Sequence, residues 1–173
     1  NVCGCVKYAD AMVCSLLCRC AQQIRSRIAP VHYGWAEAIE VPEGIEIPQE
    51  IYKKNLFRDP RGRLCMSNVF VPIVKKDSSI RTGQEIKRGG LTPYTQDATV
   101  VMVELYSTAM DLVENQHECV NLLPGQFEKV GRLPLPCAFG QTMELSLQIG
   151  GTEITASAVN TTTNGPKKSI ALQ

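Results

Sequence analysis

Apolar residues recur at every second position over much of the second half of the chain, which is the pattern of a β-strand with one buried face. The alternation is strict from Thr142 to Ile149, and it returns from Glu153 to Ala158. Gly150-Gly151 separates the two runs, and glycine suits tight hairpin turns because it tolerates positive φ. We therefore predict a β-hairpin whose core face carries Leu145 and whose surface face carries Ser146.

Other apolar stretches predict further strands at Val31–Val41, Leu64–Val74, Thr99–Tyr106 and 168–172. Pro72 lies inside the second of these, and proline predicts an edge position or a bulge because it has no N–H for the strand ladder. The polar stretch 42–63 is rich in proline and turn residues, so any strand within it is expected to be short. Several short strands separated by turns predict a mainly β fold, specifically an antiparallel β-sandwich.

The N-terminal part has a different pattern. Residues Tyr8–Ile28 carry apolar side chains at helical spacing with no proline or glycine before Pro30, which predicts one helix. Five of the eight cysteines lie in this part: Cys3, Cys5, Cys14, Cys18 and Cys20. Structural zinc sites usually separate paired cysteines by about two to four residues, so the Cys-x-Cys pairs favour free thiols over the alternative of a zinc site. We accordingly divide the chain into a Cys-rich helix at 1–28 and a β domain at 29–173.

Charge and hydropathy exclude several classes of partner. The formal net charge is +1, from 18 basic and 17 acidic residues, which gives no basic surface for nucleic acid. No apolar run reaches the roughly 18 residues of a transmembrane helix, so we expect no membrane span. No export signal is evident at Asn1, which predicts a cytoplasmic protein with reduced cysteines.

Motifs for catalysis are not found in the sequence. There is no glycine-rich phosphate loop and no G-x-S-x-G nucleophile motif. The His117-Glu118-Cys119 trio is predicted to be a solvent-exposed loop, because adjacent strand residues point to opposite faces and do not converge. The Asn160-Thr161-Thr162 sequon matters only in a secreted protein. We therefore expect a non-enzymatic protein without cofactor.

The second half contains the stretch Leu123-Pro124-Gly125-Gln126-Phe127-Glu128-Lys129-Val130-Gly131, followed by the proline-rich connector Leu133-Pro134-Leu135-Pro136. These residues resemble one segment of the substrate-binding β-domain of the heat-shock-70 chaperone family. Val71–Ile80, Thr99–Tyr106 and the hairpin 143–159 are similar to others, in the same order. The chain is most similar to the divergent group of the family numbered twelve, over about residues 25–173.

This resemblance implies a peptide-binding module. It also implies that residues 1–28 are a remnant of the end of an ATPase domain, that 43–63 is an insertion, and that ATP would be bound only by an upstream domain that this chain lacks. Neither the helical lid nor the acidic tail of the family is expected before Gln173.

In the resembled family an extended peptide lies in a channel of the β-domain, held by backbone hydrogen bonds and one apolar pocket. By position, the residues expected at that pocket are Trp35, Ile86, Val101 and Val103, and the expected partners are unfolded or extended hydrophobic peptides. Alternating apolar residues are also typical of an ordinary core, and the Trp35 indole could fill the pocket. The alternative is therefore a scaffold domain with a closed groove that binds partners through surface loops such as 43–63.

Overall fold

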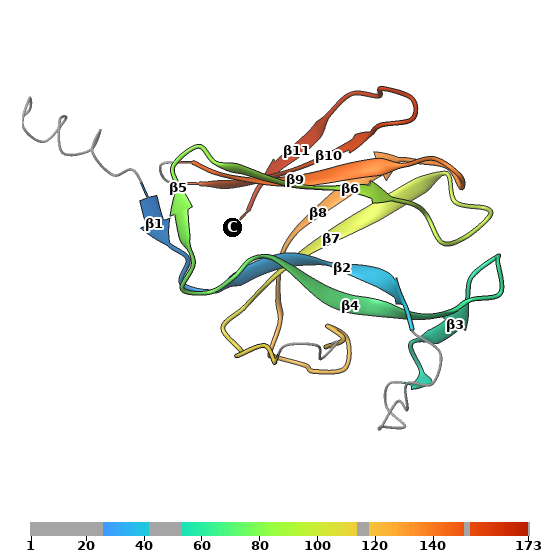
Figure 1. Cartoon of the computed structure of the whole chain (residues 1–173), viewed down its shortest axis with the longest axis horizontal. Helices are drawn as coiled ribbons and strands as arrows, with labels where there is room; N and C mark the ends of the chain where they lie inside the picture. The colour runs from blue at the N-terminus through green and yellow to red at the C-terminus, as the bar shows by residue number, and fades with distance from the viewer. Residues whose placement is uncertain (1–25, 42–52, 114–117, 151–152, 173) are drawn as a thin grey trace, which may run out of the picture.

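The computed structural model describes residues 26–41, 53–113, 118–150 and 153–172, and it is built almost entirely of antiparallel strands (Figure 1). A five-stranded sheet has the order β3 (Leu56–Arg58), β4 (Leu64–Val74), β2 (His32–Glu40), β7 (Val100–Thr108), β8 (Glu128–Pro136). A four-stranded sheet has the order β11 (Lys168–Ala171), β10 (Ile154–Asn160), β9 (Met143–Ile149), β6 (Glu85–Leu91). A two-stranded ribbon joins β1 (Ser26–Ile28) to β5 (Ser79–Arg81).

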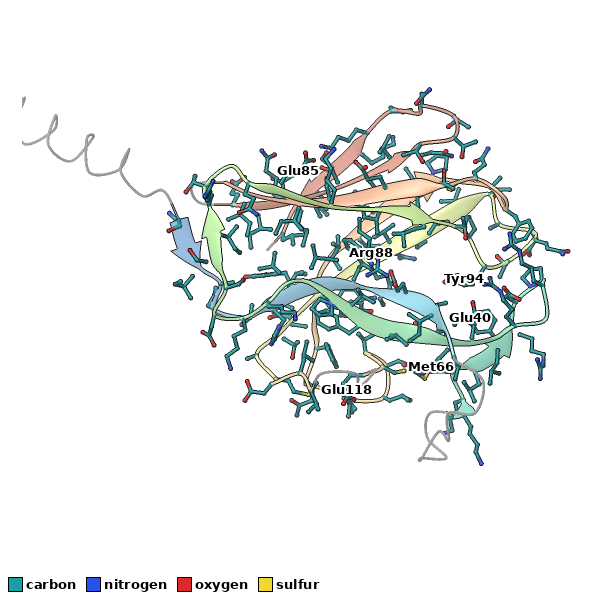
Figure 2. All side chains as sticks on the ribbon, in the orientation of Figure 1. Glu40, Met66, Glu85, Arg88, Tyr94 and Glu118 are labelled. Atoms are coloured by element: carbon teal, nitrogen blue, oxygen red, sulfur yellow. The ribbon has the colours of Figure 1, made fainter. Side chains whose placement is uncertain are left out.

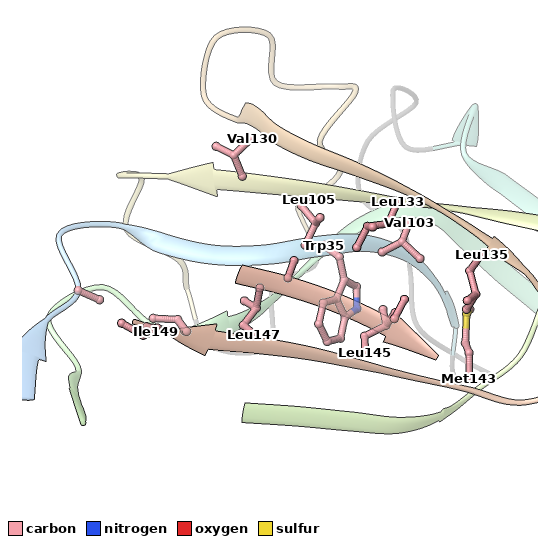
Figure 3. Packing of buried hydrophobic residues seen from close by; sticks show 14 of the residues in the cluster. Trp35, Val103, Leu105, Val130, Leu133, Leu135, Met143, Leu145, Leu147 and Ile149 are labelled. Atoms are coloured by element: carbon pink, nitrogen blue, oxygen red, sulfur yellow. The ribbon is translucent and has the colours of Figure 1, made fainter. Parts of the chain in front are cut away.

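The two larger sheets share one hydrophobic core, so the prediction of a mainly β antiparallel fold is confirmed. Figure 3 shows Trp35 of β2 among core side chains that come from both sheets, with Val103 and Leu145 close to it. Trp35 is only 1% exposed. This arrangement of two facing sheets is the one that the predicted sandwich requires.

The N-terminal prediction is wrong where it can be compared. Most of the predicted helix Tyr8–Ile28 lies outside the described residues, but its last three residues form β1, in which Arg27 pairs with Ile80 of β5. Pro30 disfavours helical dihedrals in Ala29, so a helix could not continue past Ile28. Among the described residues, the first β-strand begins at Ser26.

The predicted hairpin is present as β9 and β10, with small differences. Ile149 pairs with Ile154 at the end of the register, and directly after β9 the Gly150 N–H donates to the Glu153 carbonyl at 2.7 Å. Leu145 is buried as predicted, but Ser146 is also buried, at 5% exposure, which corrects its assignment to the surface.

Charged side chains explain the burial of Ser146 on the outer face of the four-stranded sheet. Glu85 pairs with Lys167 at 2.9 Å, and Lys87 pairs with Glu144 at 3.0 Å. Lys87 lies directly across the strand pair from Ser146. These long side chains cover a row of small residues on the outer face of the sheet. Ser146 is therefore shielded from water although it does not face the core.

The proline-rich connector is in fact the edge strand β8. Val130, Leu133 and Leu135 point into the core, while Pro134 and Pro136 are exposed and face Met102 and Val100 of β7 in the register. Proline is tolerated at an edge because no further strand needs its N–H.

A second proline-linked feature agrees with its prediction. The β2–β4 register shifts between Tyr33 and Gly34, where Gly34 pairs with Pro72 and Tyr33 with Val74. Pro72 therefore lies at a bulge, as its position in the sequence indicates.

Asn160, the first residue of the sequon, is buried and hydrogen-bonded within the fold. Asn160 is 3% exposed, and its Nδ2 donates to the Pro136 carbonyl at 3.0 Å and to Gln141 Oε1 at 2.8 Å. Its Oδ1 accepts the backbone N–H groups of Thr162 and Thr163. The side-chain amide thus ties the end of β10 to the loop after β8.

Candidate functional site

The five-stranded sheet separates into two parts between β2 and β7. These strands pair only from His32–Thr108 to Trp35–Leu105, although β2 continues to Glu40 and β7 begins at Val100. The described segments 36–40 and 100–104 therefore lie on facing strands without a register between them. A β-bulge of β4 lies opposite Ala38, where Ser67 and Asn68 oppose this one residue of β2, and Asn68 has a positive φ of 60°.

A cavity of about 580 Å³ occupies the gap and extends between the two sheets. Its walls come from β2, the start of β7, the start of β9, the end of β6 and the β6–β7 loop, and they include Trp35, Glu37, Ala38, Arg88, Tyr94, Val101, Val103, Met143 and Leu145. The volume falls in the range of about 300–1,000 Å³ that is usual for ligand pockets.

The base of the cavity is apolar and tightly packed. Trp35, Val103 and Leu145 line it and also belong to the main core, each at 5% exposure or less. The Trp35 Nε1–H donates to Glu37 Oε2 at 2.9 Å. The indole is therefore held in one orientation, and it forms a wall of the cavity without filling it.

The structure brings together three of the four residues expected at the pocket. Trp35, Val101 and Val103 line the cavity, whereas Ile86 does not. Ile86 pairs with Leu147 near the middle of β9 and packs half-buried against the core. Three other β6 residues, Arg88, Gly90 and Leu91, line the cavity instead.

An ion pair between the two sheets forms part of the cavity wall. The Arg88 guanidinium of β6 contacts Glu37 Oε1 of β2 at 2.6 Å, so Glu37 accepts from both Arg88 and Trp35. The Glu37 side chain is 12% exposed and that of Arg88 is 42% exposed. The negative charge of the Glu37 carboxylate is thus compensated by Arg88. The ion pair also joins the two sheets in the region where β2 has separated from β7.

The β6–β7 loop provides a second connection to β2. The Tyr94 hydroxyl donates to the Ala38 carbonyl at the bulge, and the Tyr94 ring packs edge-on against Phe57, with centroids 5.9 Å apart. Burial, with a further contribution from Glu37, raises the pKa of Tyr94, so its hydroxyl stays protonated and remains a donor at neutral pH. Figure 2 shows Arg88 between the two sheets near the middle of the view and Tyr94 farther to the right.

Apolar residues also lie on the solvent side of the gap. Val100 and Met102 of β7 are 49% and 40% exposed, and both contribute to the cavity wall. They alternate with the inward-facing Val101 and Val103, so β7 is apolar on both faces here. The sequence showed this double apolar face, but nothing in the sequence marked Glu37, Arg88 or Tyr94 as neighbours of it.

The described part of the chain shows no arrangement suited to metal binding. No group of three or more His, Cys, Asp or Glu side chains converges there. Cys65, Cys119 and Cys137 are buried, and burial raises the pKa of each thiol, which disfavours the reactive thiolate. Cys119 is fully buried, which corrects the prediction that the His117-Glu118-Cys119 trio is solvent-exposed; His117 lies outside the described residues.

Comparison with known proteins gives no family assignment: no protein-family model matches the chain, and no curated protein gives a significant match. Among the residues that the structure describes, no helix has the length and apolar character needed to cross a membrane.

Proposed function

We propose that this protein is a non-enzymatic binding module that takes up an extended apolar peptide segment between β2 and β7. One observation carries the proposal: two facing strand segments, 36–40 and 100–104, have no register with each other across a cavity of about 580 Å³ that has an apolar base. Unpaired strand edges recognise extended peptides through backbone hydrogen bonds, and adjacent pockets select alternate side chains. The gap offers both features in one place.

The neighbouring edge of the same sheet is much less suited to strand addition. Pro134 and Pro136 of β8 provide no backbone N–H, so two of the donors that an added strand would need are missing there. This contrast favours the gap between β2 and β7 as the place where this part of the sheet gains a strand.

Side-chain selection would come from the base of the cavity. A peptide residue that points inward would meet Trp35, Val103 and Leu145, which offer an apolar surface and no unpaired charge. Burying a Leu-like side chain there gains about 1.5–3 kcal/mol, whereas a charged side chain would lose its hydration without a free partner.

The resemblance to the heat-shock-70 substrate-binding β-domain supports the same proposal, as does the pair of facing sheets. We infer that the fold is a β-sandwich of this kind and that peptide binding by this chain needs no nucleotide. We also infer a cytoplasmic location, since all three described cysteines are free thiols.

Peptide titration with two matched substitutions tests the proposal. Val101→Phe should fill the cavity and weaken binding of a fluorescein-labelled leucine-rich heptapeptide at least about tenfold in fluorescence anisotropy, which corresponds to loss of one well-buried apolar contact. Val113→Phe makes the same change at a residue that is 57% exposed and outside the cavity, and it should leave binding unchanged.

A second candidate function, a scaffold domain with a closed groove, is favoured by one observation: the Tyr94 hydroxyl joins the β6–β7 loop to β2 across the gap in the free protein. In that case the wild-type protein would bind no heptapeptide. Val101→Phe would then act only as overpacking and lower the free energy of unfolding by about 1–3 kcal/mol. That pair of results would overturn the peptide-binding proposal.

A further inference from the structure

The Ala38 carbonyl occupies a special position in the gap. Ala38 has no register partner on β4, because the pairing passes from Glu37–Val69 to Ile39–Met66, and none on β7, whose pairing with β2 ends at Trp35. Its carbonyl accepts a hydrogen bond from the Tyr94 hydroxyl instead. A backbone acceptor in the separated part of the sheet is therefore occupied by a side chain from a loop.

Tyr94 is fixed in this position by more than one contact. Its ring meets Phe57 of β3 nearly edge-on, at an interplanar angle of 87°, and its side chain lines the cavity. Tyr94 follows Pro93 in the loop that leads from β6 to β7, so the hydrogen bond to Ala38 joins that loop to the opposite side of the gap.

An added strand needs the same acceptor that Tyr94 uses. In an antiparallel or parallel ladder the incoming backbone donates its N–H groups to the carbonyls of the host strand, and each such bond requires that the carbonyl be accessible. We propose that the Tyr94 hydroxyl is an internal competitor for the Ala38 carbonyl, so that peptide enters the groove only when Tyr94 releases it. This inference rests on the proposed peptide-binding function and adds its regulation.

The size of the effect follows from an exchange of one hydrogen bond. In the free protein Tyr94 bonds Ala38, whereas in the bound state the peptide N–H takes over the carbonyl and the hydroxyl is released to water. Tyr94→Phe removes the bond from the free state and leaves the bound state unaffected. Because one neutral hydrogen bond has a small net value, we expect peptide affinity to rise about 3- to 10-fold, mainly through faster association.

Tyr106→Phe is the matched control. Tyr106 also uses its hydroxyl in a hydrogen bond, to Glu104 Oε2 at 2.8 Å, but it does not line the cavity. The same loss of a phenolic hydroxyl at Tyr106 should leave peptide affinity and association rate unchanged.

Stopped-flow fluorescence with the labelled heptapeptide, together with acrylamide quenching of Trp35, tests the inference. Tighter and faster binding by Tyr94→Phe, with stronger quenching of Trp35 and no change in Tyr106→Phe, is the expected result. Binding by Tyr94→Phe alone, with a silent wild type, would support it further. Wild-type binding that Tyr94→Phe leaves unchanged or weakens would overturn this inference and keep the proposed function. No binding by any of the three proteins would overturn both.

Discussion

Replacing Gly34 with alanine perturbs the closest approach of β2 and β4, next to the Trp35 wall of the cavity. A Cβ added at Gly34 would lie 2.1 Å from the Val71 carbonyl oxygen and 3.0 Å from Phe70 Cε2. Backbone atoms cannot rotate out of the way as a flexible side chain can. Alanine at this position therefore forces the two strands apart.

The contacts give the magnitude of the effect. The Val71 oxygen would have to retreat from 2.1 Å to about 3.4 Å, the start of ordinary contact, which is a displacement of about 1.3 Å. Overpacking of this kind costs about 1–3 kcal/mol, and each ladder hydrogen bond that is stretched beyond its range costs a further 0.5–1.5 kcal/mol or so. We expect Gly34→Ala to lower the free energy of unfolding by about 2–4 kcal/mol.

Urea denaturation followed by the fluorescence of Trp35, the single tryptophan, measures this change. With a slope of roughly 2 kcal/mol per molar urea, the midpoint should fall by about 1–2 M. Gly89→Ala is the control, because an added Cβ there meets only Glu144 Oε2 at 3.9 Å. If Gly34→Ala and Gly89→Ala unfolded at the same urea concentration, the close approach of β2 to β4 would be wrong.

Two further predictions concern polar side chains in the fold. Burial and a neighbouring lysine lower the pKa of His32 in the folded protein. Near pH 6.5 the unfolded chain therefore binds a proton more readily than the folded protein does. The free energy of unfolding should keep its full value above pH 6.5 and decline as the pH falls below it. Urea titrations between pH 5 and 7.5 should show this slope in the wild type and lose much of it in His32→Gln. Asn160→Asp replaces the donor Nδ2 with a carboxylate oxygen that faces two acceptors, the Pro136 carbonyl and Gln141 Oε1. This change should lower the free energy of unfolding in thermal denaturation by about 2–4 kcal/mol. Asn164→Asp, at an exposed residue, should change it by less than about 0.5 kcal/mol.

Strand alternation was a reliable guide where one face meets the core and the other does not. The runs at 143–149 and 154–160 pair as expected because each places an apolar residue against the opposite sheet at every second position, large in β9 and small at Ala156 and Ala158 of β10. The same logic missed β8, since Pro134 and Pro136 argue against a strand unless the segment is known to lie at an edge. Edge position is a property of the whole sheet, and no local pattern contains it.

Some residues of the candidate site could likewise be predicted from the sequence, and others could not. Val101 and Val103 were predictable because apolar alternation places them on the inner face of β7. Glu37 and Arg88 were not, since they are 51 residues apart and meet only because β2 and β6 lie in facing sheets. The Tyr94 contact was hidden for the same reason, and its acceptor, Ala38, lies opposite a β4 bulge that leaves no trace in the composition.

The separation of β2 from β7 raises the question of why the gap does not simply close. Closure would require segment 36–40 to resume the register that ends at Trp35, but this segment stays paired with β4 on both sides of the β4 bulge at Ser67–Asn68. The ion pair of Glu37 with Arg88 then holds that part of β2 toward the opposite sheet. Because the pairing to β4 and the ion pair to β6 both oppose closure, the gap is a built feature of the fold. Under the proposed function, an added peptide strand would therefore occupy the gap while the β2–β4 pairing stays as it is.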